Sequence, residues 1–439
     1  MRLTGHKKTS EGQKTMKNLV RISLCFTAAV GFATADDVTD WNRITLDRLL
    51  GPPAVGAPLA QRPAAMVQAA VFDAVNGIAR RYTPVHVLPG AAPGASKRAA
   101  AVQAAYAILI RLFPGQTAVL AQKRALSLAA IAADREEAED QSIERGIEWG
   151  QTVADAIWAW RSTDGSSTVL PPFTGGLAPG EWRPTPPSFA PGLAPQLAQE
   201  TPWAIPSPSR FRPGGPPALT SDRYTADYNE VMSLGAANSA TRSADQTLYA
   251  HFWQSASPVD FWDPVATSLS TARDFSLLEN ARLLAYLNLA LADAVTGCWD
   301  AKYTYVSWRP VTAIQLGDMD GNPDTVADPA WAPLITTPPF PEYPSAHSCV
   351  SGAAGRVLSA YFGDNTQFSV TSDGMPGVSR SFSSFTAALD EVKNARIVGG
   401  IHFRSACEDG QGLGVAVADY ILRHSLVRIP DDGNEQSDR

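Results

Sequence analysis

Three short stretches, well separated along the chain, hold the side chains best suited to chemistry. They contribute Lys302 and Arg309, then Ser345, Ala346 and His347, and finally Arg396 and His402. The planar guanidinium groups of the two arginines match the oxygens of a tetrahedral or trigonal-bipyramidal oxyanion. The lysine adds a further cation, and the histidines add groups that can transfer a proton. We therefore expect the stretches to meet at an oxyanion site, for which phosphate and vanadate are the obvious ligands.

The middle stretch predicts the N-terminus of a helix. A proline-stiffened loop over 340–344 runs into the small-residue segment 348–362, which is typical of a helix, and Ser345 stands at its start. The first N–H groups of a helix have no partner within it and lie at the positive end of its dipole. Ser345, the amide of Ala346 and His347 would then form a cradle for an anion. The alternative is an ordinary serine cap followed by a surface histidine.

The first stretch brings its two cations together if it is helical. Lys302 and Arg309 are seven residues apart, which on an α-helix is a rotation of about 700° and returns both side chains to one face. Pro310 would then end the helix. The aromatic and β-branched residues of 303–308 leave a strand open as an alternative, and a strand would point the two cations to opposite faces.

The last stretch places a helix break between two functional side chains. A predicted helix over 385–398 delivers Arg396, and the glycine pair 399–400 ends it. The break can fold His402 back onto the point that Arg396 reaches. After it, a capping-box pattern over 405–408 predicts that the final helix begins at Ala406 and runs to His424.

Together these motifs resemble those of a known superfamily. The order Lys-x6-Arg-Pro, Pro-Ser-x-His and Arg-x5-His is similar to that of the vanadium-dependent haloperoxidases and the type 2 phosphatidic acid phosphatases. Further similarity is to the haloperoxidase branch, and it is carried by Trp299 before Lys302, Phe340-Pro-Glu-Tyr-Pro before Ser345, and the segment 227–235 followed by Phe252-Trp253. The resemblance covers about residues 220–425.

The resemblance implies a role for each site residue. Vanadate would be bound by Lys302, Arg309, Ser345, the Ala346 amide, Arg396 and His402, and phosphate would fit the same site. The catalytic residues would be His347 as the acid–base group, Lys302 to polarise the peroxide, and His402 to bind vanadium through a ring nitrogen. Trp299 and Phe340 would line the pocket for halide and substrate.

The implied reaction is the oxidation of halide by hydrogen peroxide to hypohalous acid, which halogenates a small organic substrate. Phe340 stands where bromide-selective members often have histidine, which favours chloride. A secreted acid phosphatase of the same superfamily is the alternative, in which His402 attacks phosphorus and His347 protonates the leaving alcohol. A phosphate-binding protein without turnover is a third hypothesis, although it leaves His347 without a task.

The chain departs from the family pattern at three places. Ala346 replaces the usual glycine, which keeps the amide but adds a methyl group near the anion. Ala395 replaces a common serine before Arg396. Residues 254–256 are Gln-Ser-Ala, where the fungal chloroperoxidases have an acidic residue that holds the second arginine. The partner of Arg396 is therefore not assigned from the sequence.

Composition narrows the class of protein. Of the 439 residues, 45% are hydrophobic, which is ample for a buried core. The net charge is −7, and the first 35 residues carry six basic residues and one acidic residue, so the remainder is more acidic than the whole. Such a surface argues against nucleic acid or an anionic membrane as a partner. The sequence does not fix the oligomeric state.

The first 35 residues have the pattern of a signal peptide. Lys17 and Arg21 precede the apolar run 22–32 and the small residues 33–35, so we expect cleavage before Asp36 and a secreted or periplasmic protein. A short membrane anchor is the alternative, although the run is shorter than the ~20 residues that a span requires. No later segment is long and apolar enough to cross a bilayer, so no membrane contact is expected for the mature protein.

Three cysteines remain after the signal peptide. Cys349 lies two residues after His347, and Cys407 lies five residues after His402. If both histidines reach one anion, these cysteines begin neighbouring helices and are close enough to form a disulfide in an exported protein. Buried free thiols are the alternative.

Alanine-rich stripes at helical spacing predict an all-α protein, in which a C-terminal haloperoxidase/acid-phosphatase-type bundle packs on an N-terminal helical region. The expected regions are a signal peptide (1–35), an N-terminal helical region (36–162), a proline-rich ordered loop (163–220), connecting helices (221–275), the catalytic domain (276–428) and a tail (429–439). Between 171 and 217 lie 14 of the 34 prolines. The large aromatics Trp182, Phe189, Trp203 and Phe211 among them favour an ordered loop, and a flexible linker is the alternative.

Overall fold

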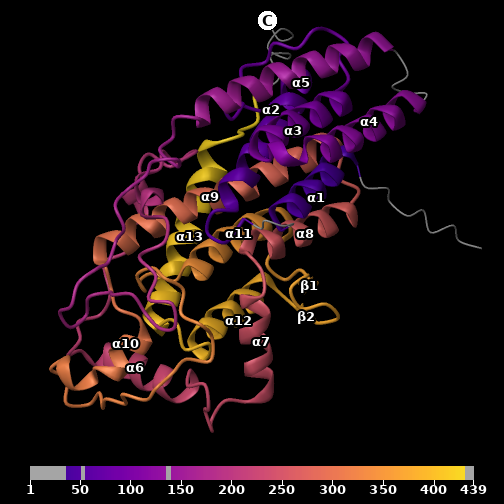
Figure 1. Cartoon of the computed structure of the whole chain (residues 1–439). Helices are drawn as coiled ribbons and strands as arrows, with labels where there is room; N and C mark the ends of the chain where they lie inside the picture. Colours follow the sequence, from indigo (N-terminus) through magenta and orange to yellow (C-terminus); the bar gives the residue numbers. More distant parts are fainter. Residues whose placement is uncertain (1–35, 51–54, 135–139, 431–439) are drawn as a thin grey trace, which may run out of the picture. The chain divides into compact units, whose positions relative to one another are not determined.

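The computed structural model describes residues 36–50, 55–134 and 140–430, and over these ranges the protein is built from α-helices (Figure 1). The first helices along the chain are α1 (Asp37–Leu50), α2 (Gln61–Ala79), α3 (Lys97–Leu112), α4 (Thr117–Ala133), α5 (Asp140–Arg161), α6 (Asp222–Leu234), α7 (Ala244–Gln254) and α8 (Pro258–Thr271). They are followed by α9 (Leu277–Tyr305), α10 (Pro310–Gln315), α11 (Ala346–Phe362), α12 (Phe385–Val398) and α13 (Arg404–His424). The short 3-10 turns are η1 (Pro114–Gln116), η2 (Pro195–Gln199), η3 (Pro208–Phe211) and η4 (Gly317–Met319).

The expected all-α fold class is confirmed. Within the described ranges the sole sheet is an antiparallel hairpin of β1 (Phe368–Thr371) and β2 (Ser379–Phe382), in which Phe368 lies opposite Phe382. The hairpin packs on α8 and α12. Among the described residues, no helix combines the length and the apolar character needed to cross a membrane. The expected signal peptide lies outside the described residues.

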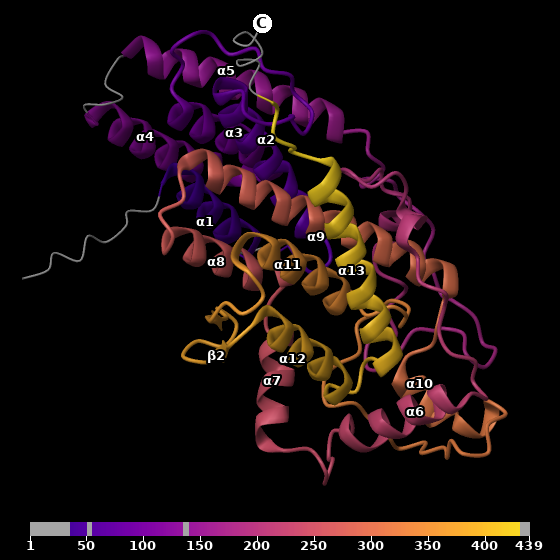
Figure 2. The same cartoon turned by 180° about the vertical axis from the view of Figure 1, so that it is seen from behind.

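Helix α9 runs through the middle of the helical bundle. Most of its 29 residues are buried, on every side of the helix, which is typical of a helix surrounded by others. Its main neighbours are α2, α11 and α13, and Figure 2 shows α9 between the N-terminal helices and α11. Ser276 and Glu279 form a capping box at its start. The other end of α9 carries Lys302 into the interior.

Helices α11 and α13 cross closely because glycines face backbone at the crossing. A Cβ atom on Gly414 would overlap the carbonyl oxygen of Cys349. A Cβ atom on Gly410 would lie 2.8 Å from the carbonyl oxygen of Ser345, which is closer than real Cβ contacts. Only residues without a side chain permit this approach. The crossing therefore fixes where α11 begins relative to α13.

The proline-rich segment lies along α9 in an ordered conformation. The carboxylate of Asp293, in the middle of α9, accepts hydrogen bonds from the three backbone N–H groups of 203–205 at 2.6 to 2.9 Å. Trp182 is fully buried, and its backbone N–H donates to the carbonyl of Val306 at 2.7 Å. These contacts hold the segment against the middle of α9 and against the end that carries Lys302.

Cys349 and Cys407 form no disulfide, so of the two alternatives left open by the sequence the structure shows the buried free thiols. All three cysteines of the described residues are buried free thiols. The thiol of Cys349 is hydrogen-bonded to Cys298 on α9, whereas the thiol of Cys407 lies beside the hydroxyls of Ser345 and Ser348. Sequence spacing from two histidines that meet does not fix the direction in which each helix turn points its sulfur atom.

Candidate active site

The N-terminus of α11 forms one side of the site, as the sequence predicts. Ser345 is the N-cap residue, and its N–H donates to the carbonyl of Ala406 in α13 at 2.9 Å. His347 lies in the first turn and hydrogen-bonds through its ring to the carbonyl of Trp253. Its Nε2 atom is buried and has no hydrogen-bond partner among the described residues. An unpartnered buried polar atom costs about 1–3 kcal/mol, so Nε2 marks a position that a ligand can satisfy.

Lys302 and Arg309 meet in the site, but not by the predicted route. Helix α9 ends at Tyr305, and Val306 adopts the left-handed conformation with φ of 48°. Arg309 is the N-cap residue of α10, and Pro310 begins that helix instead of ending the previous one. The single helix inferred from their spacing is therefore wrong. The strand alternative is also wrong, because α9 continues to Tyr305.

Backbone carbonyl groups anchor both cations. Lys302 Nζ donates to two carbonyl groups of the loop 340–342 at 2.8 and 2.9 Å. Arg309 Nε donates to a third carbonyl of that loop, and its Nη1 donates to the carbonyl of Ile401, each at 2.8 Å. In the part of the chain that the structure describes, Arg309 Nη2 is buried without a partner. The loop thus holds both side chains and leaves the two N–H groups of Arg309 Nη2 unsatisfied.

The ring of Phe340 lies close to both cations. Its centroid is 5.0 Å from Lys302 Nζ and 4.7 Å from Arg309 Cζ, within the range of cation–π interactions. The Trp299 ring lies 5.1 Å from that of Phe340. The two aromatic residues that the resemblance assigns to a halide pocket therefore form one apolar wall beside the positive charges.

Arg396, near the end of α12, has an amide as its partner. Its Nη2 donates to Gln254 Oε1 at 2.7 Å, so Gln254 stands where the resemblance led us to look for an acidic residue. Its Nε and Nη1 atoms are buried with no partner within the described ranges. A neutral partner leaves the charge of Arg396 uncompensated, and the N–H groups of two of its nitrogens remain available for a ligand.

A turn at Gly400 brings His402 back towards Arg396. Gly400 has φ of 75°, and a Cβ atom there would overlap the carbonyl oxygen of Gly235, so glycine is required. His402 Nδ1 lies 2.9 Å from Glu342 Oε1, and Nε2 lies 3.1 Å from Arg309 Nη1. Because a guanidinium only donates, Nε2 is the acceptor and Nδ1 carries the proton. This is the tautomer of a histidine that binds a metal through Nε2.

Glu342 is the site residue that sequence reasoning missed. Its side chain is 1% exposed, and Oε1 also accepts the N–H of Phe403 at 3.0 Å. Burial raises the pKa of this carboxyl to about 7. The available signal was a glutamate enclosed by the prolines of the loop 340–344. Its partner His402 lies 60 residues further along the chain, and no spacing rule connects the two.

The buried charges of the site do not balance. Among the described residues, Lys302, Arg309 and Arg396 are buried cations around it, and Glu342 is the buried carboxylate that faces them. Burial lowers the pKa of Lys302 to about 8 and that of Arg309 to about 9. A bound oxyanion would offset the excess positive charge and restore the ordinary pKa values.

Both histidines are neutral in this environment. Burial, followed by the charge of Arg396, holds the pKa of His347 well below its usual value. Burial, followed by the charge of Arg309, does the same for His402. An anion next to His347 favours its protonated form, so binding of an oxyanion raises the pKa of this residue.

A cavity of about 150 Å³ lies where these groups meet. The predicted site residues that line it are Trp299, Phe340, Ala346, His347, Arg396 and His402. The predicted residues that lie fully buried behind this lining are Lys302, Arg309 and Ser345. Gln254 also lines the cavity. The structure therefore brings the three sequence motifs together at one cavity.

Sequence comparison finds relatives for the C-terminal part of the chain. Residues 282–429 match a family model described as the VCPO second helical-bundle domain. Over 180 residues the chain is 28% identical to the vanadium chloroperoxidase of Curvularia inaequalis. The aligned stretch spans 34% of this chain and 29% of that relative's length.

Structural comparison extends the similarity to most of the chain. A crystal structure of a bacterial vanadium-dependent iodoperoxidase superposes with a TM-score of 0.76 at 27% identity, covering 89% of this chain and 97% of the other. The holo form of a bacterial vanadium-dependent chloroperoxidase superposes with a TM-score of 0.63 at 17% identity, covering 90% of this chain and 94% of the other. The second similarity is one of fold.

Proposed function

The chain belongs to the vanadium-dependent haloperoxidase family, and we propose that it is an enzyme that holds vanadate and uses hydrogen peroxide to oxidise a halide to hypohalous acid. The observation that carries the proposal is a set of buried polar atoms that lack partners among the described residues: Arg309 Nη2, Arg396 Nε and Nη1, and His347 Nε2. They belong to residues that line one cavity or lie behind its lining, where positive charge exceeds negative charge. A tetrahedral oxyanion satisfies both the hydrogen bonds and the charge.

Vanadate fits the donor set of this site. Arg309 and Arg396 would hydrogen-bond its oxygens through their free N–H groups, and the Ala346 amide at the positive end of α11 would add another donor. Lys302 has one ammonium proton left for the ligand, since two are bound to carbonyl groups. His402 would bind vanadium through the Nε2 lone pair, in place of the hydrogen bond that this atom accepts from Arg309 Nη1 in the structure. Bound vanadate supplies Lewis-acid activation of peroxide for attack by halide.

His347 is the residue placed to move a proton. Its Nε2 faces the site without a partner from the described chain, and its hydrogen bond to the carbonyl of Trp253 orients the ring. As a neutral imidazole with a free Nε2 lone pair, it would accept the proton that hydrogen peroxide loses on binding. It can later return that proton to the departing oxygen. Trp299 and Phe340 keep bulk water from the apolar side of the cavity.

An acid phosphatase would use the same anion-binding residues, with His402 as the nucleophile. Nothing in the described site favours ester hydrolysis over halide oxidation, whereas the wall of Trp299 and Phe340 offers the apolar surface that a peroxide and halide pocket can use. We further propose that the physiological acceptor is a small organic molecule and that the N-terminal segment 1–35 exports the protein.

A paired assay distinguishes the two functions. Protein with orthovanadate, hydrogen peroxide and bromide is followed by bromination of phenol red, and vanadate-free protein is given p-nitrophenyl phosphate in parallel. The proposal predicts vanadate-dependent bromination that is lost in His402→Ala. His424→Ala, which removes an exposed histidine at the end of α13, is the matched control and should keep full activity. Efficient ester hydrolysis without bromination would assign the protein as a phosphatase.

A further inference from the structure

A second cavity, of about 270 Å³, adjoins the active-site cavity. The two share three lining residues, Pro58, Gln61 and Val295, which form the wall between them. The lining of the second cavity is mainly aliphatic and includes Leu197 from the proline-rich segment and Ala292 from α9. A molecule bound in the second cavity would therefore lie directly beside the active site.

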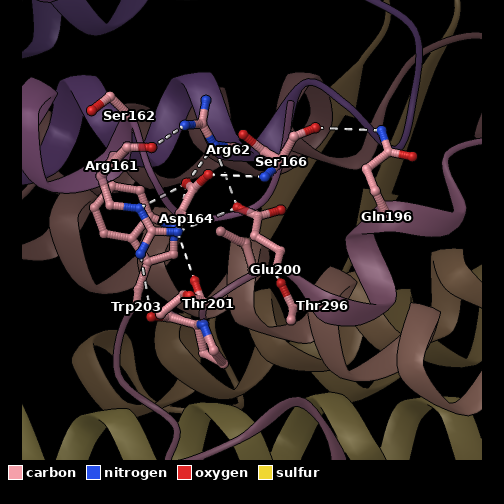
Figure 3. Close-up of polar contacts among 12 residues, drawn as sticks. Arg62, Arg161, Ser162, Asp164, Ser166, Gln196, Glu200, Thr201, Trp203 and Thr296 are labelled. Carbon is pink, nitrogen blue, oxygen red and sulfur yellow. Dashed lines mark hydrogen bonds and ion pairs between the residues drawn. The ribbon is translucent and has the colours of Figure 1, made fainter. Parts of the chain in front are cut away.

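One end of the second cavity is polar, and Figure 3 shows the network that forms it. Asp164 Oδ2 lies 2.7 Å from Arg62 Nε and 3.0 Å from Arg161 Nε, which makes it the tightly held carboxylate. Glu200 is held more loosely, because its Oε1 lies 3.3 Å from Arg161 Nη2 and 3.4 Å from Arg62 Nε. Both contacts use Oε1, and Figure 3 shows the other oxygen turned away from the guanidinium groups.

Glu200 is a buried carboxylate with remaining capacity to accept a hydrogen bond. Glu200 is 4% exposed and lines the second cavity. Burial, with added repulsion from Asp164, raises the pKa of this carboxyl to about 7. A ligand that donates a hydrogen bond to Glu200 would reduce the cost of keeping the carboxylate charged.

A second acceptor lies in the wall between the two cavities. Gln61 is 1% exposed, and its Nε2 donates to Ser257 Oγ at 3.1 Å. Its Oε1 is buried and unpartnered among the residues that the structure describes. The wall thus presents a carbonyl oxygen that a ligand can satisfy. Glu200, through its second oxygen, and the unpartnered Gln61 Oε1 can each accept a hydrogen bond, so the ligand should supply donors.

We propose that this second cavity binds a neutral phenol as the organic substrate, with its ring against the aliphatic wall and its hydroxyl donating to Glu200. The inference rests on the proposed function, which supplies the halogenating agent. An organic cation is disfavoured by the guanidinium groups of Arg62 and Arg161, and an organic anion by the carboxylates of Glu200 and Asp164. The volume is below the range of roughly 300–1,000 Å³ for drug-sized ligands, which favours a single ring.

The geometry suits electrophilic halogenation of the bound ring. A hydrogen bond from the phenol hydroxyl to Glu200 increases the electron density of the ring. Hypohalous acid from the adjoining cavity then reacts with it: the O–halogen bond and one aryl C–H bond break, and a C–halogen bond forms. The released proton combines with the hydroxide from hypohalous acid to give water, so the ring carbon is oxidised by two electrons and the halogen is reduced.

The test uses the full chain and p-cresol as the probe. Binding to vanadate-free protein is measured by saturation-transfer NMR, and bromination of p-cresol and formation of triiodide from iodide are measured with vanadate-loaded protein. Ala292→Phe fills the cavity from a position that lines it but not the active-site cavity, and Glu200→Gln removes the charge. Asp419→Asn, which removes the partner of Arg356 outside both cavities, is the control.

The proposal predicts that p-cresol binds the wild-type protein and that its KM rises at least about 10-fold in Ala292→Phe and Glu200→Gln. Triiodide formation should be unchanged in both variants, and Asp419→Asn should behave as wild type. Absence of p-cresol binding to the wild type, or an unchanged KM in both variants, would overturn the assignment. If the vanadate-loaded wild-type protein forms no triiodide, the proposed function is refuted instead. Thermal unfolding shows whether each variant is folded. If Glu200→Gln does not fold, the KM of Ala292→Phe alone decides the test.

Discussion

Replacing Glu342 by glutamine should separate vanadate binding from phosphate binding. Glu342 Oε1 accepts the hydrogen bond from His402 Nδ1 at 2.9 Å, and Glu342 is 1% exposed. The carboxylate therefore both orients the imidazole and strengthens Nε2 as a ligand. Hydrogen bonds to a charged acceptor are roughly twice as strong as neutral ones. Loss of such a partner behind a metal-binding histidine typically weakens metal affinity 10–100-fold, or about 1.4–2.8 kcal/mol.

Phosphate does not need a coordinate bond from His402, whereas vanadate does. Removing the negative charge of Glu342 strengthens the electrostatic attraction for both anions by a similar amount, so the ratio of their affinities cancels that effect. We therefore predict that Glu342→Gln lowers the preference for vanadate over phosphate by ~10–100-fold at pH 8. Because the pKa of Glu342 is raised to about 7, the wild-type carboxyl is protonated at pH 6 and the difference between the two proteins should largely disappear there.

Isothermal titration calorimetry with each anion at pH 6 and pH 8 measures the ratio. Glu230→Gln is the matched control, because Glu230 pairs with Arg404 on the protein surface, two residues after His402, and does not contact the imidazole. Its ratio should equal that of the wild type. An unchanged ratio in Glu342→Gln at pH 8, or an equal change at pH 6, would refute the role assigned to this carboxylate.

The site makes three further predictions. His347→Ala should lower kcat for bromide oxidation by ~10²–10⁴-fold with a much smaller change in vanadate affinity. It should also abolish the part of phosphate binding that strengthens as pH falls, since a bound anion raises the low pKa of His347. A variant whose phosphate binding keeps the wild-type pH profile would contradict this role. Phe340→His should change the ratio of chloride to bromide turnover, because the ring contacts both Lys302 and Arg309; identical ratios would dismiss the residue. Gly414→Ala should destabilise the fold by about 1–3 kcal/mol, because its Cβ would overlap the backbone of α11. Gly412→Ala, whose Cβ would have nothing within 4 Å, should stabilise the fold by up to about 1 kcal/mol. Denaturant unfolding measures both variants, and equal effects would contradict the close crossing.

The sequence predicted which residues meet but not always how they meet. The N-terminus of α11 followed from local rules, because a serine after prolines and before small residues is a helix start in most contexts. The route from Lys302 to Arg309 did not, since the left-handed residue Val306 interrupts the helix and no glycine or asparagine marks it. Their convergence depends on the loop 340–342, whose carbonyl groups bind both cations.

Contacts between distant segments account for the remaining differences. The final helix begins at Arg404, before the predicted capping box, because Asp227 of α6 accepts the N–H of Ser405 at 3.1 Å. Glu342 and Gln254 were not predicted as partners of His402 and Arg396, because each pair joins elements that only the tertiary fold brings together. Local patterns specify helices and their ends, whereas the partners of buried polar groups depend on packing.

The most direct test of the central claim is a vanadate titration of the vanadate-free protein, with the rate of bromide oxidation measured at fixed hydrogen peroxide. The account predicts that the rate rises from zero to a plateau at one vanadate per chain, that phosphate competes, and that Arg396→Ala shifts the curve to much higher vanadate. A rate that does not depend on vanadate, or stoichiometric binding of vanadate that supports no oxidation, would contradict it.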